Sequence, residues 1–87
     1  MGDDRIEAAV TKFLSANFYV PDRIRIQPEM SLIGQGIIDS TGVLELVYFI
    51  EGTFGIKVSD EDMTPDNLDT VGSIARFVKR KNSSPPS

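Results

Sequence analysis

Apolar residues recur with the 3.6-residue period of an α-helix in three separate stretches of this sequence. The first stretch runs from Asp3 to about Asn17, the second from about Ser40 to Phe54, and the third from Asp69 or Thr70 to about Lys81. A chain of 87 residues has room for one core, so the three helices must bury their apolar faces against one another. The sequence therefore predicts a small all-α bundle.

A shorter helix is expected between the second and third stretches. Ser59 can cap its first turn, which consists of the acids Asp60, Glu61 and Asp62. The helix dipole favours acidic residues at this end of a helix. Residues 64–67 are turn-forming types and predict a turn. The expected architecture is a four-helix bundle, with three main helices and one short one, in a single domain over residues 1–81. Residues 82–87, made largely of Ser and Pro, are expected to form a disordered tail.

A long first connection joins the first two helices. Residues 19–38 have no clear period, prolines interrupt them, and glycines loosen their end. A connection of about twenty residues is unusual in so small a domain. We expect scattered apolar side chains to pin this loop to the core, namely those of Val20, Ile24, Ile26, Leu32 and Ile33.

The sequence contains no Cys, no His and no Trp, and these absences exclude much chemistry. Ser-His-Asp and Cys-His nucleophiles, Cys/His zinc sites and disulfides cannot be built. A calcium loop of the D-x-[DN]-x-[DN]-G type fails because Pro65 stands where glycine is needed. The sequence still contains carboxylate, Tyr, Lys and Ser residues, but their spacing is not typical of a catalytic site. We therefore expect neither an enzyme nor a metal site.

The net charge of −4 narrows the choice of partners. An acidic chain repels phosphate backbones and anionic lipid, so a basic patch on another protein is a better partner than nucleic acid or a membrane. No apolar run approaches the ~18 residues of a membrane span. The first four residues carry acids where a signal peptide carries bases. A cytoplasmic monomer is the expectation.

Asp39 and Ser40 stand where the long loop meets the apolar second helix. Asp39 can accept a hydrogen bond from the first turn, which leaves the Ser40 hydroxyl exposed beside the small residues Thr41 and Gly42. A phosphate ester on this hydroxyl would lie against backbone N–H groups at the positive end of the helix dipole. The alternative is that Asp39 and Ser40 form a simple helix cap, which is the commoner role of such residues.

The second helix also has an outward strip that faces away from the predicted core. It consists of Thr41, Leu44, Glu45 and Tyr48. An apolar patch rimmed by acids suits docking to a partner with a basic rim, and the acids at 60–62 can extend that rim. Two alternatives remain open. Leu44 and Tyr48 can pack under the long loop, and the acids can simply be a solvated helix start.

The sequence resembles that of acyl carrier proteins over roughly Leu32 to Val78. The Asp-Ser-Leu motif region of that family is similar to residues 36–47, which read Gly-Ile-Ile-Asp-Ser-Thr-Gly-Val-Leu-Glu-Leu-Val. The family's exit from its second helix into an acidic turn is similar to residues 54–62, which begin Phe-Gly-Ile-Lys-Val. This spacing of several matching segments is far more specific than an isolated Asp-Ser pair.

The resemblance implies that Ser40 receives a 4′-phosphopantetheine arm from coenzyme A, added by a phosphopantetheinyl transferase. The thiol of that arm would hold an acyl or aminoacyl group as a thioester. Asp39 would help to present the serine, and Leu44, Glu45 and Tyr48 would face the partners. Those partners would be the transferase, an acyl- or aminoacyl-loading ligase, and a downstream transferase or synthase.

Some positions depart from the family pattern. Thr41 stands where Leu or Met is usual, and Gly42 and Gly52 stand at positions that are often acidic. The motif strings look closer to those of D-alanyl and stand-alone aminoacyl carriers than to those of bulk fatty acid carriers. The rival hypothesis is a non-catalytic interaction module, in which Leu44, Glu45 and Tyr48 bind a partner and Ser40 is only a cap.

Overall fold

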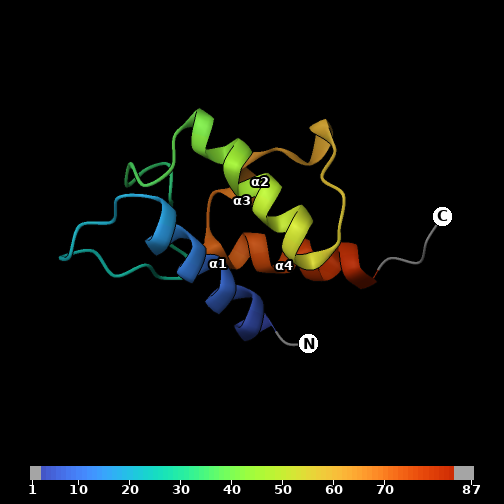
Figure 1. Cartoon of the computed structure of the whole chain (residues 1–87), viewed down its shortest axis with the longest axis horizontal. Helices are drawn as coiled ribbons and strands as arrows, with labels where there is room; N and C mark the ends of the chain where they lie inside the picture. Colours follow the sequence, from blue (N-terminus) through green and yellow to red (C-terminus); the bar gives the residue numbers. More distant parts are fainter. Residues whose placement is uncertain (1–2, 84–87) are drawn as a thin grey trace.

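The first and last helices pack together to form one side of the bundle (Figure 1). In the computed structural model, which describes residues 3–83, α1 spans Asp3–Asn17 and α4 spans Val71–Ser83. Their contacting faces carry the residues that the 3.6-residue period predicts, and these are almost completely buried: Ile6, Val10, Leu14, Val71, Ile74, Ala75 and Val78. Every regular element in this part of the chain is helical, which confirms the predicted all-α fold.

The central helix α2 spans Ser40–Phe54 and has clear signals at both ends. Oδ1 of Asp39 accepts a hydrogen bond from the Gly42 N–H at 2.7 Å, so Asp39 is the N-cap. Gly55 adopts the left-handed conformation at φ 68° and donates its N–H to the Glu51 carbonyl. Between these caps Leu46, Val47 and Ile50 are buried. Both bounds agree with the prediction from the sequence.

Two short elements, not one, connect α2 to α4. A 3₁₀ turn, η1, covers Asp60–Asp62, as the acidic run predicts. The turn expected at residues 64–67 is instead one turn of α-helix, α3, which spans Pro65–Leu68. Pro65 suits the start of a helix because its φ is already helical and its missing N–H needs no partner. Leu68 is buried and anchors α3 to the core.

The ends of α4 differ from expectation in two details. Of the two candidate caps, Thr70 performs the role, because its Oγ1 accepts a hydrogen bond from the Ser73 N–H at 2.9 Å. The helix continues to Ser83, two residues past Lys81. Asn82 and Ser83 therefore belong to α4 and not to a disordered tail, while 84–87 lie outside the described residues. The last turn is braced by the ion pair of Lys81 with Asp62, at 2.8 Å.

The long first loop, residues 18–39, is fastened to the start of α4. The Gly72 N–H donates to the Pro28 carbonyl, and the Leu32 N–H donates to the Asp69 carbonyl, each at 2.7 Å. Leu32 is fully buried, and three of the predicted pins are partly buried against the core, namely Val20, Ile24 and Ile26. Ile33 is not a pin, because 48% of its surface is exposed and it lies over a cavity described below. Within residues 3–83, no helix has both the length and the apolarity to cross a membrane.

The ion pair between η1 and α4 predicts a pH dependence of stability. A hydrogen bond from Lys81 and a second from the Ser59 N–H lower the pKa of Asp62 below its ordinary value of 3.8. A carboxylate with a lowered pKa stabilises the fold above its unfolded-state pKa, and this contribution disappears as pH falls through its folded-state pKa. Lys81→Met is therefore expected to reduce stability by about 0.2–1 kcal/mol at neutral pH, and the loss should shrink as the pH is lowered past 3.8.

The measurement is the thermal midpoint of both proteins across that pH range. Lys12→Met, which removes an exposed lysine from α1, is the matched control for the change in net charge. If the difference in thermal midpoint between wild type and Lys81→Met stays constant with pH, Lys81 does not act through the Asp62 carboxylate.

Candidate functional site

Ser40 is the first residue of α2, and its side chain is exposed. The capping role belongs to its neighbour, since Asp39 accepts the Gly42 N–H through its side chain and the Val43 N–H through its carbonyl. Within the part of the chain that the structure describes, no hydrogen bond engages the Ser40 hydroxyl. This hydroxyl can therefore be reached by another protein without disrupting the helix cap.

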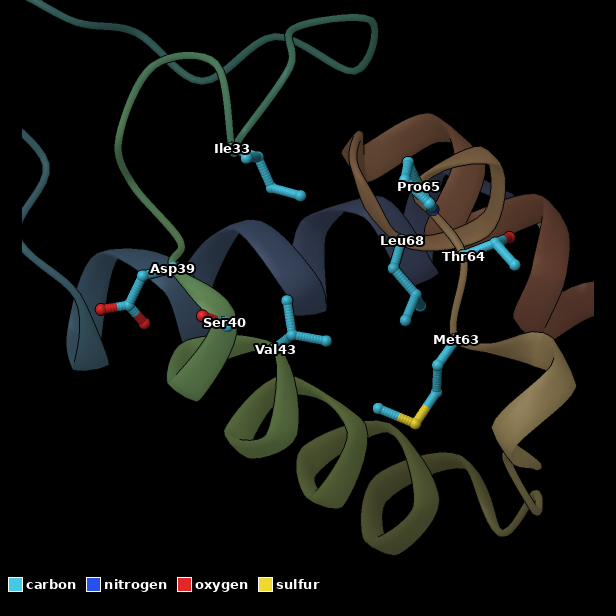
Figure 2. A pocket seen from close by; sticks show the side chains of 8 residues that line it. All are labelled: Ile33, Asp39, Ser40, Val43, Met63, Thr64, Pro65 and Leu68. Carbon is cyan, nitrogen blue, oxygen red and sulfur yellow. The ribbon is translucent and has the colours of Figure 1, made fainter.

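An apolar cavity of about 370 Å³ opens beside Ser40 (Figure 2). Asp39 and Ser40 lie at one end of it and Met63 lies toward the other. The remaining lining residues come from the long loop, from α2, and from α3 with its N-cap residue: Ile33, Val43, Thr64, Pro65 and Leu68. The site thus combines a free hydroxyl with an adjoining space that favours an aliphatic group.

Nothing in the sequence gives a reason to place Ile33, Val43, Met63 and Leu68 around one space. Ile33 and Met63 belong to segments without a helical period, so no repeat in the sequence indicates which way they point. The one available signal is that Met63 is an apolar residue directly after an acidic turn. An apolar side chain gains free energy when it turns toward the core, and the structure shows Met63 half-buried against the core.

A second groove lies on the other side of the Ser40 turn and is lined mostly by polar groups. It includes Asn17, Phe18, Thr41, Gly42 and Glu45 among its lining residues. The Phe18 ring covers Gly42 so closely that a Cβ at Gly42 would lie 2.7 Å from Cε1 of the ring. A larger residue at this position would therefore force the Phe18 ring or the helix to shift.

The outward strip of α2 is exposed as predicted. Leu44 is 49% and Tyr48 72% exposed, and Thr41 and Glu45 are also on the surface. The alternative in which Leu44 and Tyr48 pack under the long loop is therefore wrong. The Glu51 carboxylate is engaged beyond the end of α2, where it accepts the Val58 N–H at 2.9 Å.

The three acids of η1 have different surroundings. Asp60 and Glu61 are exposed. Asp62 is engaged within the fold, where its Oδ2 accepts from the Ser59 N–H and hydroxyl and pairs with Lys81. Of the acidic rim expected from the sequence, Asp60 and Glu61 are thus the members whose carboxylates face solvent. Among residues 3–83 no group of acids is arranged to hold a metal ion.

Comparison with known proteins decides the family. No family model matches the sequence. An acyl carrier protein of Thermotoga maritima is 33% identical over 60 residues, which cover 69% of this chain and 72% of that protein. The chain belongs to the acyl carrier protein family. Members of this family are carriers and not enzymes, so the chain is a carrier protein without catalytic activity of its own.

Two more distant members of the acyl carrier protein family are longer than this chain. The meromycolate extension acyl carrier proteins of Mycobacterium leprae and Mycobacterium tuberculosis are each 31% identical to it over 61 residues. That match covers 70% of this chain, and the chain spans about half the length of these relatives, 51% in each case. The family resemblance read from residues 36–62 is confirmed by these matches.

The packing around α2 predicts opposite effects for two glycine substitutions in the same helix. A Cβ at Gly52 would meet no atom within 4 Å, so Gly52→Ala should stabilise the protein by roughly 0.5–1 kcal/mol through the lower entropy of the unfolded chain. A Cβ at Gly42 would meet the Phe18 ring, which cannot retreat easily because it packs edge-on against Phe13 at 5.9 Å. Gly42→Ala should therefore destabilise the protein.

Urea denaturation of the two variants and the wild type measures this difference. Equal stabilisation by both alanines would contradict the contact between Phe18 and Gly42.

Proposed function

We propose that Ser40 carries a 4′-phosphopantetheine arm and that the protein presents an acyl group, held on this arm, to partner enzymes. The single observation that carries the proposal is the free Ser40 hydroxyl at the mouth of an apolar cavity. When bound, the arm supplies a thiol that holds the acyl group as a thioester. Because the sequence contains no cysteine, the protein itself provides no such thiol.

The residues around Ser40 suit a phosphate ester. The first N–H groups of a helix lack intrahelical acceptors and favour a negative charge, and Ser40 begins a helix of 15 residues. Asp39 has its carboxylate committed to the Gly42 N–H and keeps the first turn in place. The small residues Thr41 and Gly42 leave the approach to the hydroxyl open.

The cavity favours an acyl cargo over an aminoacyl one. Its inner surface is formed by apolar side chains, chiefly those of Ile33, Val43, Met63 and Leu68. An aminoacyl group would bring an ammonium, whose burial is costly without a partner. The one carboxylate among the lining residues, that of Asp39, stands at the mouth and already caps α2. An aliphatic chain that extends from Ser40 toward Met63 needs no such partner.

The outward strip of α2 is the proposed docking surface for the partner enzymes. These are a phosphopantetheinyl transferase, an acyl-loading ligase, and a downstream transferase or synthase. Tyr48 and Leu44 offer apolar contact, while Glu45 on α2 and the exposed Asp60 and Glu61 on η1 offer negative charge to a basic rim. A tethered cargo reaches each partner at a high effective concentration, so docking can be weak and rapid. The bundle, with α4 complete to Ser83, would act as one carrier domain, monomeric and cytoplasmic.

Loading with coenzyme A and a broad-specificity phosphopantetheinyl transferase tests the attachment site. Wild type is expected to gain the mass of one arm, and Ser40→Ala is expected to gain none because the accepting oxygen is missing. Intact-protein mass spectrometry gives the answer directly. Ser15→Ala, which removes an exposed serine from α1, is the matched control and should be loaded like wild type.

A wild-type protein that stays unmodified by a demonstrably active transferase would overturn the proposal. The rival function, an interaction module that needs no arm, makes a different prediction. There Ser40→Ala keeps partner binding and cellular function, whereas Tyr48→Ala, which removes the more exposed of the two large apolar side chains of the docking surface, loses both.

A further inference from the structure

We propose that Asp69 is a positioning residue that holds the cargo cavity closed, although it does not line the cavity. This inference rests on the function proposed above. Asp69 lies between α3 and α4, directly after Leu68, whose side chain forms part of the cavity wall. Its position is typical of a helix cap, yet the cap of α4 is provided by Thr70. The Asp69 carboxylate is thereby left for another role.

Both oxygens of that carboxylate are bonded to the long loop. The Ser31 hydroxyl donates to Oδ2 at 2.7 Å, and the Ile33 N–H donates to Oδ1 at 3.0 Å. The backbone carbonyl of Asp69 accepts a third bond, from the Leu32 N–H at 2.7 Å. Three successive loop residues are thus fastened to one residue that is 36 to 38 positions away in the sequence.

These bonds join two opposite walls of the cavity. Figure 2 shows Ile33 extending from the loop over the space, with Pro65 and Leu68 of α3 facing it. Ile33 is held there by its backbone bond to Asp69, since 48% of its surface is exposed and packing alone fixes it weakly. Without the carboxylate, the turn that carries Ile33 can move away from α3 and open the cavity to water.

The remaining contacts limit that movement to a local opening. Leu32 is fully buried, and its bond to the Asp69 carbonyl does not involve the side chain that a substitution removes. The loop is also held at Pro28 by the Gly72 N–H. Replacing the Asp69 carboxylate should therefore loosen one wall of the cavity and leave the bundle folded.

The experiment compares two cargoes on the same arm. Octanoyl and acetyl groups are loaded onto Ser40 from the corresponding coenzyme A thioesters with a phosphopantetheinyl transferase. Hydroxylamine then converts each thioester to a hydroxamic acid and frees the thiol, at a rate that reports how exposed the thioester is. The measured quantity is the ratio of the acetyl rate to the octanoyl rate. In wild type this ratio should exceed one, because the octanoyl chain enters the cavity and the acetyl group is too short to do so.

Asp69→Ala is expected to lower this ratio about tenfold, or to unity if the wild-type ratio is below ten. A tenfold change corresponds to the loss of about one charge-assisted hydrogen bond from the closed state. The acetyl rate should not change. Ser31→Ala removes the bond to Oδ2 and the bond that the Gly34 N–H donates to the same hydroxyl at 2.9 Å, but it keeps the Ile33 bond to Oδ1. It should lower the ratio by a smaller factor, and it tests the inference by itself if Asp69→Ala does not fold. Asp66→Ala removes an exposed carboxylate from α3 with the same change of charge and should leave the ratio as in wild type.

A merely structural role for Asp69 would lower the thermal midpoint of the variant and leave the ratio at its wild-type value, which would overturn the inference. Equal acetyl and octanoyl rates in loaded wild type would also overturn it, while the carrier function would stand. A wild type that accepts no arm at all would refute the proposed function itself.

Discussion

The hydrogen bond between the Asp39 carboxylate and the Gly42 N–H fixes where the central helix begins, and the rest of the site depends on it. Because Asp39 satisfies the first turn, the adjacent Ser40 is placed in the helix with its hydroxyl uncommitted. The same bond requires a compact first turn, and Gly42 allows the Phe18 ring to cover that turn from the other side. One capping interaction thus exposes the serine and shapes the groove beside it.

The cavity next to Ser40 is produced by the connections and not by the long helices alone. α1 and α4 bury their apolar faces against each other, and α2 buries Leu46, Val47 and Ile50 in the same core. The space that remains beside α2 is enclosed by the turn at Ile33 and by the segment from Met63 to Leu68. A hydrogen bond to Asp69 holds the turn at Ile33 in place. The ion pair of Asp62 with Lys81 fastens the start of the segment from Met63 to Leu68 to α4. The long first loop, unusual for its length, therefore has a function in forming the site.

Local signals predicted the helices well, and long-range contacts account for what was missed. Both ends of α2 were predictable because Asp39 and Gly55 act on their own neighbours. The choice between Asp69 and Thr70 as the cap of α4 was open in the sequence, because both residue types can cap a helix. It is settled by Ser31, which is 38 positions from Asp69 and binds its carboxylate. No periodicity reveals such a pair, so neither the cavity nor the closing role that we propose for Asp69 could be derived from the sequence.

The central claim is that an aliphatic group attached at Ser40 lies inside the protein and extends toward Met63. The most direct measurement is an NMR spectrum of the arm-bearing protein loaded with ¹³C-labelled octanoate, observed for nuclear Overhauser contacts between the chain and the protein. The account predicts contacts from the end of the chain to the ε-methyl group of Met63 and to the methyl groups of Leu68. A loaded protein in which the labelled chain shows no contact with either residue would contradict it.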